Sequence, residues 1–374
     1  MDQIEKTSLV KKSDGPCRFL TSGIDTLYVC YPFDIAASNL DLDSLDYQKA
    51  LLKDDPSRHV HPVALGGVNF GLLTNGAFPY RWVLANRQMT WKLARALQPS
   101  VQVEFSSEGL WHEGADALHD QVQAIARAEK MVAVAPDAVS RVDYAFDYHV
   151  PHRDFSIVNM VSRARKDSQY RAGETLQTLT FGRGDIVVRV YDKSAEIAEK
   201  SGKAWFHDIW GVKDHVWRIE FQLRREALKR FGIRTMADVL SGIGDALRDI
   251  ASRHTTMRLP ARDSNTSRWP LHPIWQDLLQ RIDALPNLGV VRDFNRTASL
   301  ALREHDLARS IVGNLKGLAA LQALRGGRGG TTDRPPDIET TIKRLQFFAA
   351  REVHPFAFEQ AVQERIRKYE AGQW

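Results

Sequence analysis

The chain has 374 residues, of which 43% are hydrophobic and 26% charged, and it carries a formal net charge of +5. This composition is typical of a globular protein with a sizeable core. The two cysteines, Cys17 and Cys30, exclude a disulfide framework. No apolar run is long enough to cross a bilayer, so we expect no membrane contact, and the two cysteines favour a reducing cytoplasm as the compartment. The basic charge favours a polyanionic partner.

The first half of the chain reads as strands followed by a helix. Residues 1–20 are predicted to be a polar tail, and "GIDTLYVCYPFD" alternates like a half-buried strand. Residues 34–60 are polar and indicate loop or helix. "YRWVLANRQMTWKL" predicts a hairpin, "VQVEFSS" a strand and "GADALHDQVQAIARAEK" a helix.

The same order then repeats. "SRVDYAFDYHV" predicts a strand, "DFSIVNMVSRARK" a helix and "LQTLTFGRGDIVVRVYDK" a hairpin that turns at Gly182 and Gly184. "HVWRIEFQLRREAL" predicts a strand running into a helix, and a further helix follows from Met236. The run Val103-Glu104-Phe105 falls at the place that Ile219-Glu220-Phe221 takes later.

We interpret this order as an internal duplication. It predicts an α+β fold, in which two pseudo-repeated halves at about 21–135 and 136–260 form one curved, largely antiparallel sheet with helices on one face. Residues 21–260 would then be one domain. After it we expect a connector and helical region at 261–324, a flexible basic linker at 325–337 ("RGGRGGTTDRPPD") and a helical tail at 338–374.

Three predicted strands of the second half share a polar face, because side chains on a strand alternate between faces. Val142, Tyr144, Phe146, Val188, Val190, Ile219 and Phe221 fall on the apolar faces. The opposite faces carry two aspartates, a glutamate, arginines and one tyrosine: Arg141, Asp143, Asp147, Arg189, Tyr191, Arg218 and Glu220.

Such a face is suited to metal-assisted phosphoryl transfer. Carboxylate oxygens suit Mg²⁺ or Mn²⁺, and Arg189, Lys193 and Arg218 could position phosphate oxygens. A tyrosine hydroxyl titrates near pH 10, so a nearby cation would be needed to favour the phenolate of Tyr191. The alternative is that the carboxylates merely pair with the arginines on a solvated sheet face.

These strands resemble those of the replication initiation factor family, the Rep_trans type, which includes rolling-circle plasmid initiators and related relaxases of conjugative elements. "SRVDYAFDYHV" is similar to the family's strand of the form R-x-D-hydrophobic-x-x-D. "VVRVYDKSAE" is similar to its R-x-Y-D-K-x-x-E, and "VWRIEFQLRREAL" to its R-x-E-x-x-hydrophobic strand. "TSGIDTLYV" and "SRWPLHPIW" also match, so the resemblance spans about residues 20–280.

The resemblance implies a DNA nicking and joining enzyme that cleaves one strand at an origin, often extruded as a hairpin. Tyr191 would be the nucleophile, joined to the 5′-phosphate while a 3′-OH is freed. Asp143 and Glu220 would be metal ligands, with Asp147 as a further one. Arg189, Lys193 and Arg218 would contact phosphate. Family members can recruit a host helicase and tend to act as dimers.

Three alternatives stay open. His59-Val60-His61 matches the histidine pair of a different relaxase superfamily, but "RHVHP" lies in a poor strand context, so we favour the carboxylate site. The chain could also be a sequence-specific DNA-binding protein that has lost nicking, or an adaptor whose polar face binds a protein. The sequence does not separate plasmid or phage replication from conjugative transfer.

Overall fold

The computed structural model describes residues 17–54, 60–153, 155–285, 296–326 and 336–370. Part of the predicted tail, His59 and most of the predicted linker lie outside these residues. The chain forms two compact units, Met1–Asp293 and Phe294–Trp374. The first holds the sheet, and the described part of the second consists of helices α9 (Arg296–Gly326), α10 (Ile338–Glu352) and α11 (Pro355–Glu370). None of the helices described is both long and apolar enough to span a bilayer.

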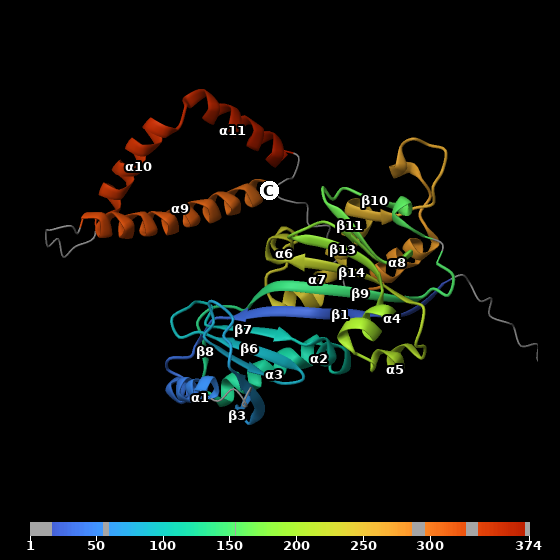
Figure 1. Ribbon diagram of the computed structural model, residues 1–374, viewed down its shortest axis with the longest axis horizontal. Coiled ribbons are helices and arrows are strands. Elements are labelled where there is room, and N and C mark those ends of the chain that lie inside the picture. The colour runs from blue at the N-terminus through green and yellow to red at the C-terminus, as the bar shows by residue number, and fades with distance from the viewer. Residues whose placement is uncertain (1–16, 55–59, 154, 286–295, 327–335, 371–374) are drawn as a thin grey trace, which may run out of the picture. The chain divides into compact units, whose positions relative to one another are not determined.

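Eleven strands form one antiparallel sheet in the order β11-β12-β13-β14-β9-β1-β7-β6-β5-β4-β3 (Figure 1). One half supplies β1 (Arg18–Tyr31), β3 (Val60–Leu65), β4 (Val68–Leu73), β5 (Trp82–Ala85), β6 (Met89–Leu93) and β7 (Val101–Phe105). The other supplies β9 (Ala138–His149), β11 (Asp167–Ala172), β12 (Thr175–Phe181), β13 (Ile186–Asp192) and β14 (Val216–Arg224). Two further pairs are short: β2 (Phe33–Asp34) with β8 (Val132–Ala133), and β10 (Met160–Ser162) with β15 (Thr255–Met257).

The sheet order confirms the predicted duplication and the α+β class. Strands β1 and β9 lie side by side at the centre, followed outward by β7, β6 and β5 on one side and by β14, β13 and β12 on the other. Each of β7 and β14 leads into a pair of helices. These are α2 (Ser107–His112) and α3 (Ala115–Ala128) after β7, and α6 (Arg225–Arg230) and α7 (Met236–Asp249) after β14. Val103–Phe105 and Ile219–Phe221 therefore occupy matching strands.

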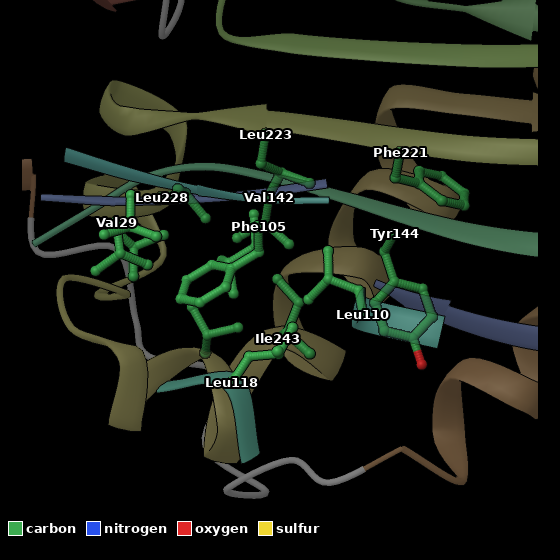
Figure 2. Close-up of a cluster of buried hydrophobic side chains, with 14 of the residues drawn as sticks. Val29, Phe105, Leu110, Leu118, Val142, Tyr144, Phe221, Leu223, Leu228 and Ile243 are labelled. Atoms are coloured by element: carbon green, nitrogen blue, oxygen red, sulfur yellow. The ribbon is translucent and has the colours of Figure 1, made fainter. Parts of the chain in front are cut away.

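The main core lies between the apolar face of the sheet and helices α3, α7 and α8 (Pro273–Asp283), with α1 (Leu42–Asp54) covering β3 and β4. Figure 2 shows Val142 and Leu223 of the sheet near Leu118 of α3 and Ile243 of α7. Burial of each such side chain contributes about 1.5–3 kcal/mol relative to leaving it exposed. This packing fixes which face of β9, β13 and β14 is left for polar groups.

The turn between β12 and β13 requires glycine. Gly182 has a φ of +95°, and a Cβ at this position would clash with the carbonyl oxygen of Ile186. Glycine reaches this conformation without the steric cost that a side chain would meet. The turn sets the register that pairs Thr178 with Tyr191.

Two local predictions are wrong. The run predicted as a helix before residue 167 contains only a 3₁₀ turn (Ile157–Asn159) and strand β10, because Met160 to Ser162 pair with β15, nearly a hundred residues later. Such long-range pairing leaves no local signal. The poor strand context predicted for "RHVHP" is also wrong, because His61 lies on strand β3. However, β3 is an edge strand, at the other end of the sheet from β11, and not a central strand.

The connection between β13 and β14 forms a small structure of its own. It contains α4 (Lys193–Glu196), a π-helical turn (Ile197–Ser201) and α5 (Phe206–Trp210). Ile197, Phe206, Trp210 and Val216 pack there as a second, smaller core. Trp210 donates its Nε1 hydrogen to Asp147, so this insertion covers part of the polar face of the sheet.

Candidate active site

The strand register places the predicted polar residues on one face. Tyr191 of β13 lies opposite Arg218 of β14, which lies opposite Asp147 of β9. One step along, Arg189 lies opposite Glu220. Residues directly opposite in an antiparallel pair share a face, so these side chains all project to the same side.

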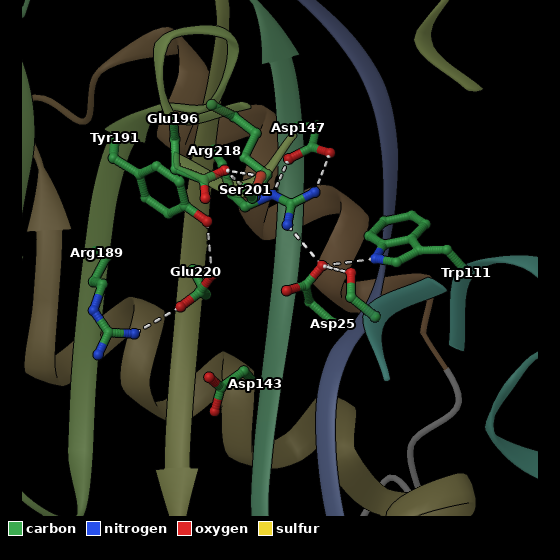
Figure 3. A network of polar contacts seen from close by, with 12 residues as sticks. Asp25, Trp111, Asp143, Asp147, Arg189, Tyr191, Glu196, Ser201, Arg218 and Glu220 are labelled. Carbon is green, nitrogen blue, oxygen red and sulfur yellow. Dashed lines mark hydrogen bonds and ion pairs between the residues drawn. The ribbon is translucent and has the colours of Figure 1, made fainter. Parts of the chain in front are cut away.

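Tyr191, Glu220 and Arg189 form a continuous chain of hydrogen bonds (Figure 3). The Tyr191 hydroxyl donates to Glu220 Oε2 at 2.9 Å, and Arg189 Nη1 donates to Glu220 Oε1 at 2.7 Å. A second Arg189 nitrogen, Nη2, donates to Gln222 at 2.8 Å. Glu220 is 6% exposed, so its carboxylate has exchanged water for these two partners.

The surroundings of Tyr191 oppose its ionisation. Burial raises the pKa of the hydroxyl well above its usual value of 10, and the Glu220 carboxylate raises it further. The Arg218 guanidinium acts in the other direction and lowers it. The hydroxyl is therefore protonated at neutral pH and acts as a hydrogen-bond donor.

Asp143 lies on β9 opposite Gln222 and pairs with Arg141 of its own strand. Arg141 donates from Nε to Asp143 Oδ1 at 2.8 Å and from Nη2 to Oδ2 at 2.5 Å. Burial raises the pKa of Asp143 to about 6, against the opposing effect of Arg141, and the Glu220 carboxylate adds to the rise. Part of the Asp143 population therefore carries a proton near pH 6.

Arg218 and Asp147 form a fully buried ion pair, each 0% exposed. Arg218 donates from Nε to Asp147 Oδ1 at 2.7 Å and from Nη2 to Oδ2 at 2.8 Å, while Nη1 reaches Asp25 at 2.8 Å. The Arg218 guanidinium also lies 4.6 Å from the centroid of the Phe206 ring. This arrangement favours a positioning role for both residues over the phosphate and metal contacts that the sequence predicts.

Asp25 also belongs to this network, although it is not among the polar residues predicted from the sequence. A β-bulge between Ile24 and Thr26 turns its side chain to the polar face. Ser107, Trp111 and Arg218 all donate to its Oδ1, at 2.8 to 2.9 Å. Burial alone would raise the pKa of Asp25, but the charges of Arg218, Lys203 and Lys193 outweigh burial and hold it below its usual value. The available signal was an aspartate in the otherwise apolar strand "GIDTLYV".

Lys193 follows the tyrosine strand and is 3% exposed. Its Nζ donates to Glu196 at 2.5 Å and lies 5.7 Å from the centroid of the Tyr191 ring. Burial, followed by the charge of Arg218, lowers the pKa of this ammonium group. The structure thus places the Lys193 ammonium group beside the tyrosine ring, where it also forms an ion pair with the Glu196 carboxylate.

The carboxylates can be tested against the predicted metal ion. Among the residues described, no group of three or more His, Cys, Asp or Glu side chains is placed to hold a metal. Asp143 and Glu220 do supply oxygen donors from neighbouring strands of one face. Because Mg²⁺ is usually bound by one or two carboxylates together with water and substrate phosphates, this pair fits such an ion. The oxygens of all three carboxylates accept hydrogen bonds in this structure. The arginines that pair with Asp143 and Glu220 are 24% and 31% exposed at their side chains and have room to turn away, whereas Arg218, which holds Asp147, is 0% exposed.

Solved structures include chains that are similar to this one. No family model matches the sequence, and no curated protein matches it. The chain is similar in structure to the rolling circle replication initiator protein from Geobacillus stearothermophilus, with a TM-score of 0.41 and 19% sequence identity. The similarity covers 72% of this chain and 99% of that one.

Proposed function

We propose that the chain is a metal-dependent DNA nicking and joining enzyme that initiates replication at an origin and uses Tyr191 as its nucleophile. The observation that carries the proposal is the hydrogen bond of 2.9 Å from the Tyr191 hydroxyl to Glu220 Oε2. A nucleophile within hydrogen-bond reach of a base, which another group in turn orients, is the arrangement that covalent catalysis needs. Here Arg189 orients the base.

The chemistry follows from these contacts. The Tyr191 oxygen attacks the phosphorus of one phosphodiester, and its proton passes to Glu220 Oε2. The new bond joins the tyrosine oxygen to phosphorus, and the bond from phosphorus to the 3′ oxygen breaks. The 3′ oxygen takes up a proton from the solvent and leaves as a 3′-OH, and Glu220 returns the proton of Tyr191 to the solvent. Because the phosphotyrosine retains the phosphodiester energy, the reverse attack rejoins the strand.

Once Arg189 has turned to the phosphate, the Oε1 oxygen of Glu220 would hold Mg²⁺ or Mn²⁺ together with Asp143, while Oε2 takes the proton of Tyr191. The ion, when bound, would stabilise negative charge on the phosphate. Of the three predicted phosphate contacts, Arg189 has the most exposed side chain, 31% against 3% for Lys193 and 0% for Arg218. Lys193 lies beside the Tyr191 ring. Arg189 would exchange its contact with Glu220 for the incoming phosphate, because the guanidinium fork suits both groups. Asp147 and Arg218 would hold the strands and Tyr191 in register.

A second function is favoured by a specific observation. Burial and Glu220 raise the pKa of Tyr191, and the acidic groups are paired with arginines, as in a structural network. This state suits a DNA-binding protein of the same fold that does not nick.

A conjugative relaxase would use the same chemistry as the initiator. Recruitment of a host helicase and formation of a homodimer remain predictions from the family resemblance.

A covalent-adduct assay tests the proposal. Supercoiled DNA carrying the flanking region of the gene is incubated with the protein and Mg²⁺ or Mn²⁺, and protein joined to DNA is detected on a denaturing gel. We expect a metal-dependent adduct that Tyr191→Phe abolishes and Tyr47→Phe retains, since Tyr47 is an exposed residue of helix α1. An adduct that persists in Tyr191→Phe would overturn the assignment. Salt-sensitive binding without an adduct would favour the second function.

A further inference from the structure

Tyr170 lies in the same row of the sheet as Tyr191. It pairs with Thr178 on β12, and Thr178 pairs with Tyr191 on β13. Directly paired residues of antiparallel strands share a face, so Tyr170 projects to the side that carries Tyr191. Two strand spacings separate the tyrosines, which places their backbones about 10 Å apart.

The ring of Tyr170 is open to solvent, unlike the aromatic side chains of the core. It is 52% exposed, and all six residues of β11 are exposed on this edge strand. A β-bulge between Tyr170 and Arg171 interrupts the register there. Bulges at sheet edges re-aim side chains next to functional sites.

A lysine from the insertion between β13 and β14 lies over the exposed ring of Tyr170. Lys200 of the π-helical turn places its Nζ 5.2 Å from the centroid of the Tyr170 ring. The same turn is tied to β12 by a hydrogen bond of 2.8 Å from Gln177 to Glu199. The insertion that flanks Tyr191 thus also supplies the cation beside Tyr170. Between the two tyrosines the face carries the short side chain of Thr178.

We propose that Tyr170 and Lys200 form a binding subsite for a nucleotide of single-stranded DNA that flanks the scissile phosphate. The Tyr170 ring stacks on the base, and Lys200 contacts a phosphate. The combination of an aromatic platform with a cation is how proteins hold single strands without reading their sequence. The row Tyr170–Thr178–Tyr191 gives the strand a path across the sheet from the subsite to the nucleophile. This inference rests on the proposed function, since it names the DNA path of that site.

Equilibrium binding of a fluorescein-labelled oligothymidylate of about 12 nucleotides, within the range of known single-strand sites, tests the subsite. The full chain is used with EDTA, so the measurement does not need cleavage. We expect Tyr170→Ala to raise Kd about 5- to 150-fold, which is the cost of losing one stacked base. Tyr170→Phe should stay within about twofold, because the ring is kept.

Lys200→Gln is an independent variant on another element. It should raise Kd and reduce the slope of log K against log salt by about 0.7, as expected for one phosphate contact on a single strand. Tyr47→Ala removes a tyrosine of comparable exposure (62%) on α1 and should leave Kd within about twofold. Thermal melts of every variant check folding.

Three outcomes would overturn the subsite. These are an unchanged Kd for Tyr170→Ala, an equal loss for Tyr170→Phe, which would assign the effect to the hydroxyl, and no binding of the oligonucleotide by the wild type. Each is distinguishable from failure of the proposed function, because the adduct assay reports on Tyr191 alone. A protein that forms the Tyr191 adduct but binds normally after Tyr170→Ala would keep the function and lose the subsite.

Discussion

Tyr191 and Glu220 come from neighbouring strands and meet diagonally, with the tyrosine hydroxyl 2.9 Å from Glu220 Oε2. The direct partner of Tyr191 across the ladder is Arg218, and the direct partner of Glu220 is Arg189. The hydroxyl therefore lies between a base and a cation. Under the proposed function, the reactivity of the hydroxyl would depend on whether the Glu220 carboxylate or the Arg218 guanidinium acts on it more strongly.

Glu220→Gln should lower the rate of adduct formation by about 10²- to 10⁴-fold while DNA binding is retained. Glutamine can still accept the tyrosine hydrogen bond but cannot take up the proton, and a lost base has this size of effect. The rate is measured in single turnover at saturating protein. Glu104→Gln is the matched control, because Glu104 holds the equivalent position in β7 and pairs with Lys92. Equal losses in the two variants would contradict the assignment.

Asp143 should make the protein less stable as pH rises from about 4 to 6 in EDTA. Its pKa is about 6 in the folded state against 3.8 unfolded, so the fold favours the protonated form. The stabilisation is present below the unfolded pKa and is lost as pH rises through the folded one. Two units correspond to about 3 kcal/mol.

The measurement is the difference in the free energy of unfolding between wild type and Asp143→Asn at several pH values. Asparagine does not titrate, so other groups cancel in the difference. The wild type should lose stability relative to the variant between pH 4 and 6 and stay level above that. A difference that is constant with pH would show that Asp143 ionises normally in the fold.

Much of the candidate site could be predicted because strand alternation assigns each side chain to a face. The rule separated Tyr191 from Val188 and Val190, which are buried in the core. The rule also placed Glu220 on the other face of β14 from its neighbours Ile219 and Phe221. The duplication of the halves could be read from the order of elements, since each half is a local run of the chain.

The remaining features depend on contacts between distant segments. Asp25 faces the site only because a bulge breaks the alternation of β1, and its partner Arg218 lies 193 residues away. The sequence predicted that Lys193 and Arg218 contact phosphate, but both are buried. Their burial depends on the insertion between β13 and β14, which folds over them. Periodicity within one segment carries no information on such packing.

The β12–β13 turn offers a test of backbone conformation. Gly182→Ala should destabilise the protein by about 1–3 kcal/mol or more, because the alanine would adopt a positive φ and also clash with Ile186. Gly184→Ala is the matched control: its φ is +106°, but no atom lies within 4 Å of a Cβ there. Denaturant unfolding should show a smaller loss for Gly184→Ala, and equal losses would exclude the clash with Ile186.

Arg218→Met should destabilise the protein by about 3–5 kcal/mol, because it leaves the carboxylate of Asp147 buried without its cation. Arg248→Met is the control, since its pair with Asp283 is about half exposed and worth about 0–1 kcal/mol. In a double-mutant cycle with Asp147→Asn, the loss for both changes should be smaller than the sum of the single losses. Additive losses would mean that the two groups do not stabilise each other. The ion pair would then not contribute to the pairing of β14 with β9 next to Tyr191.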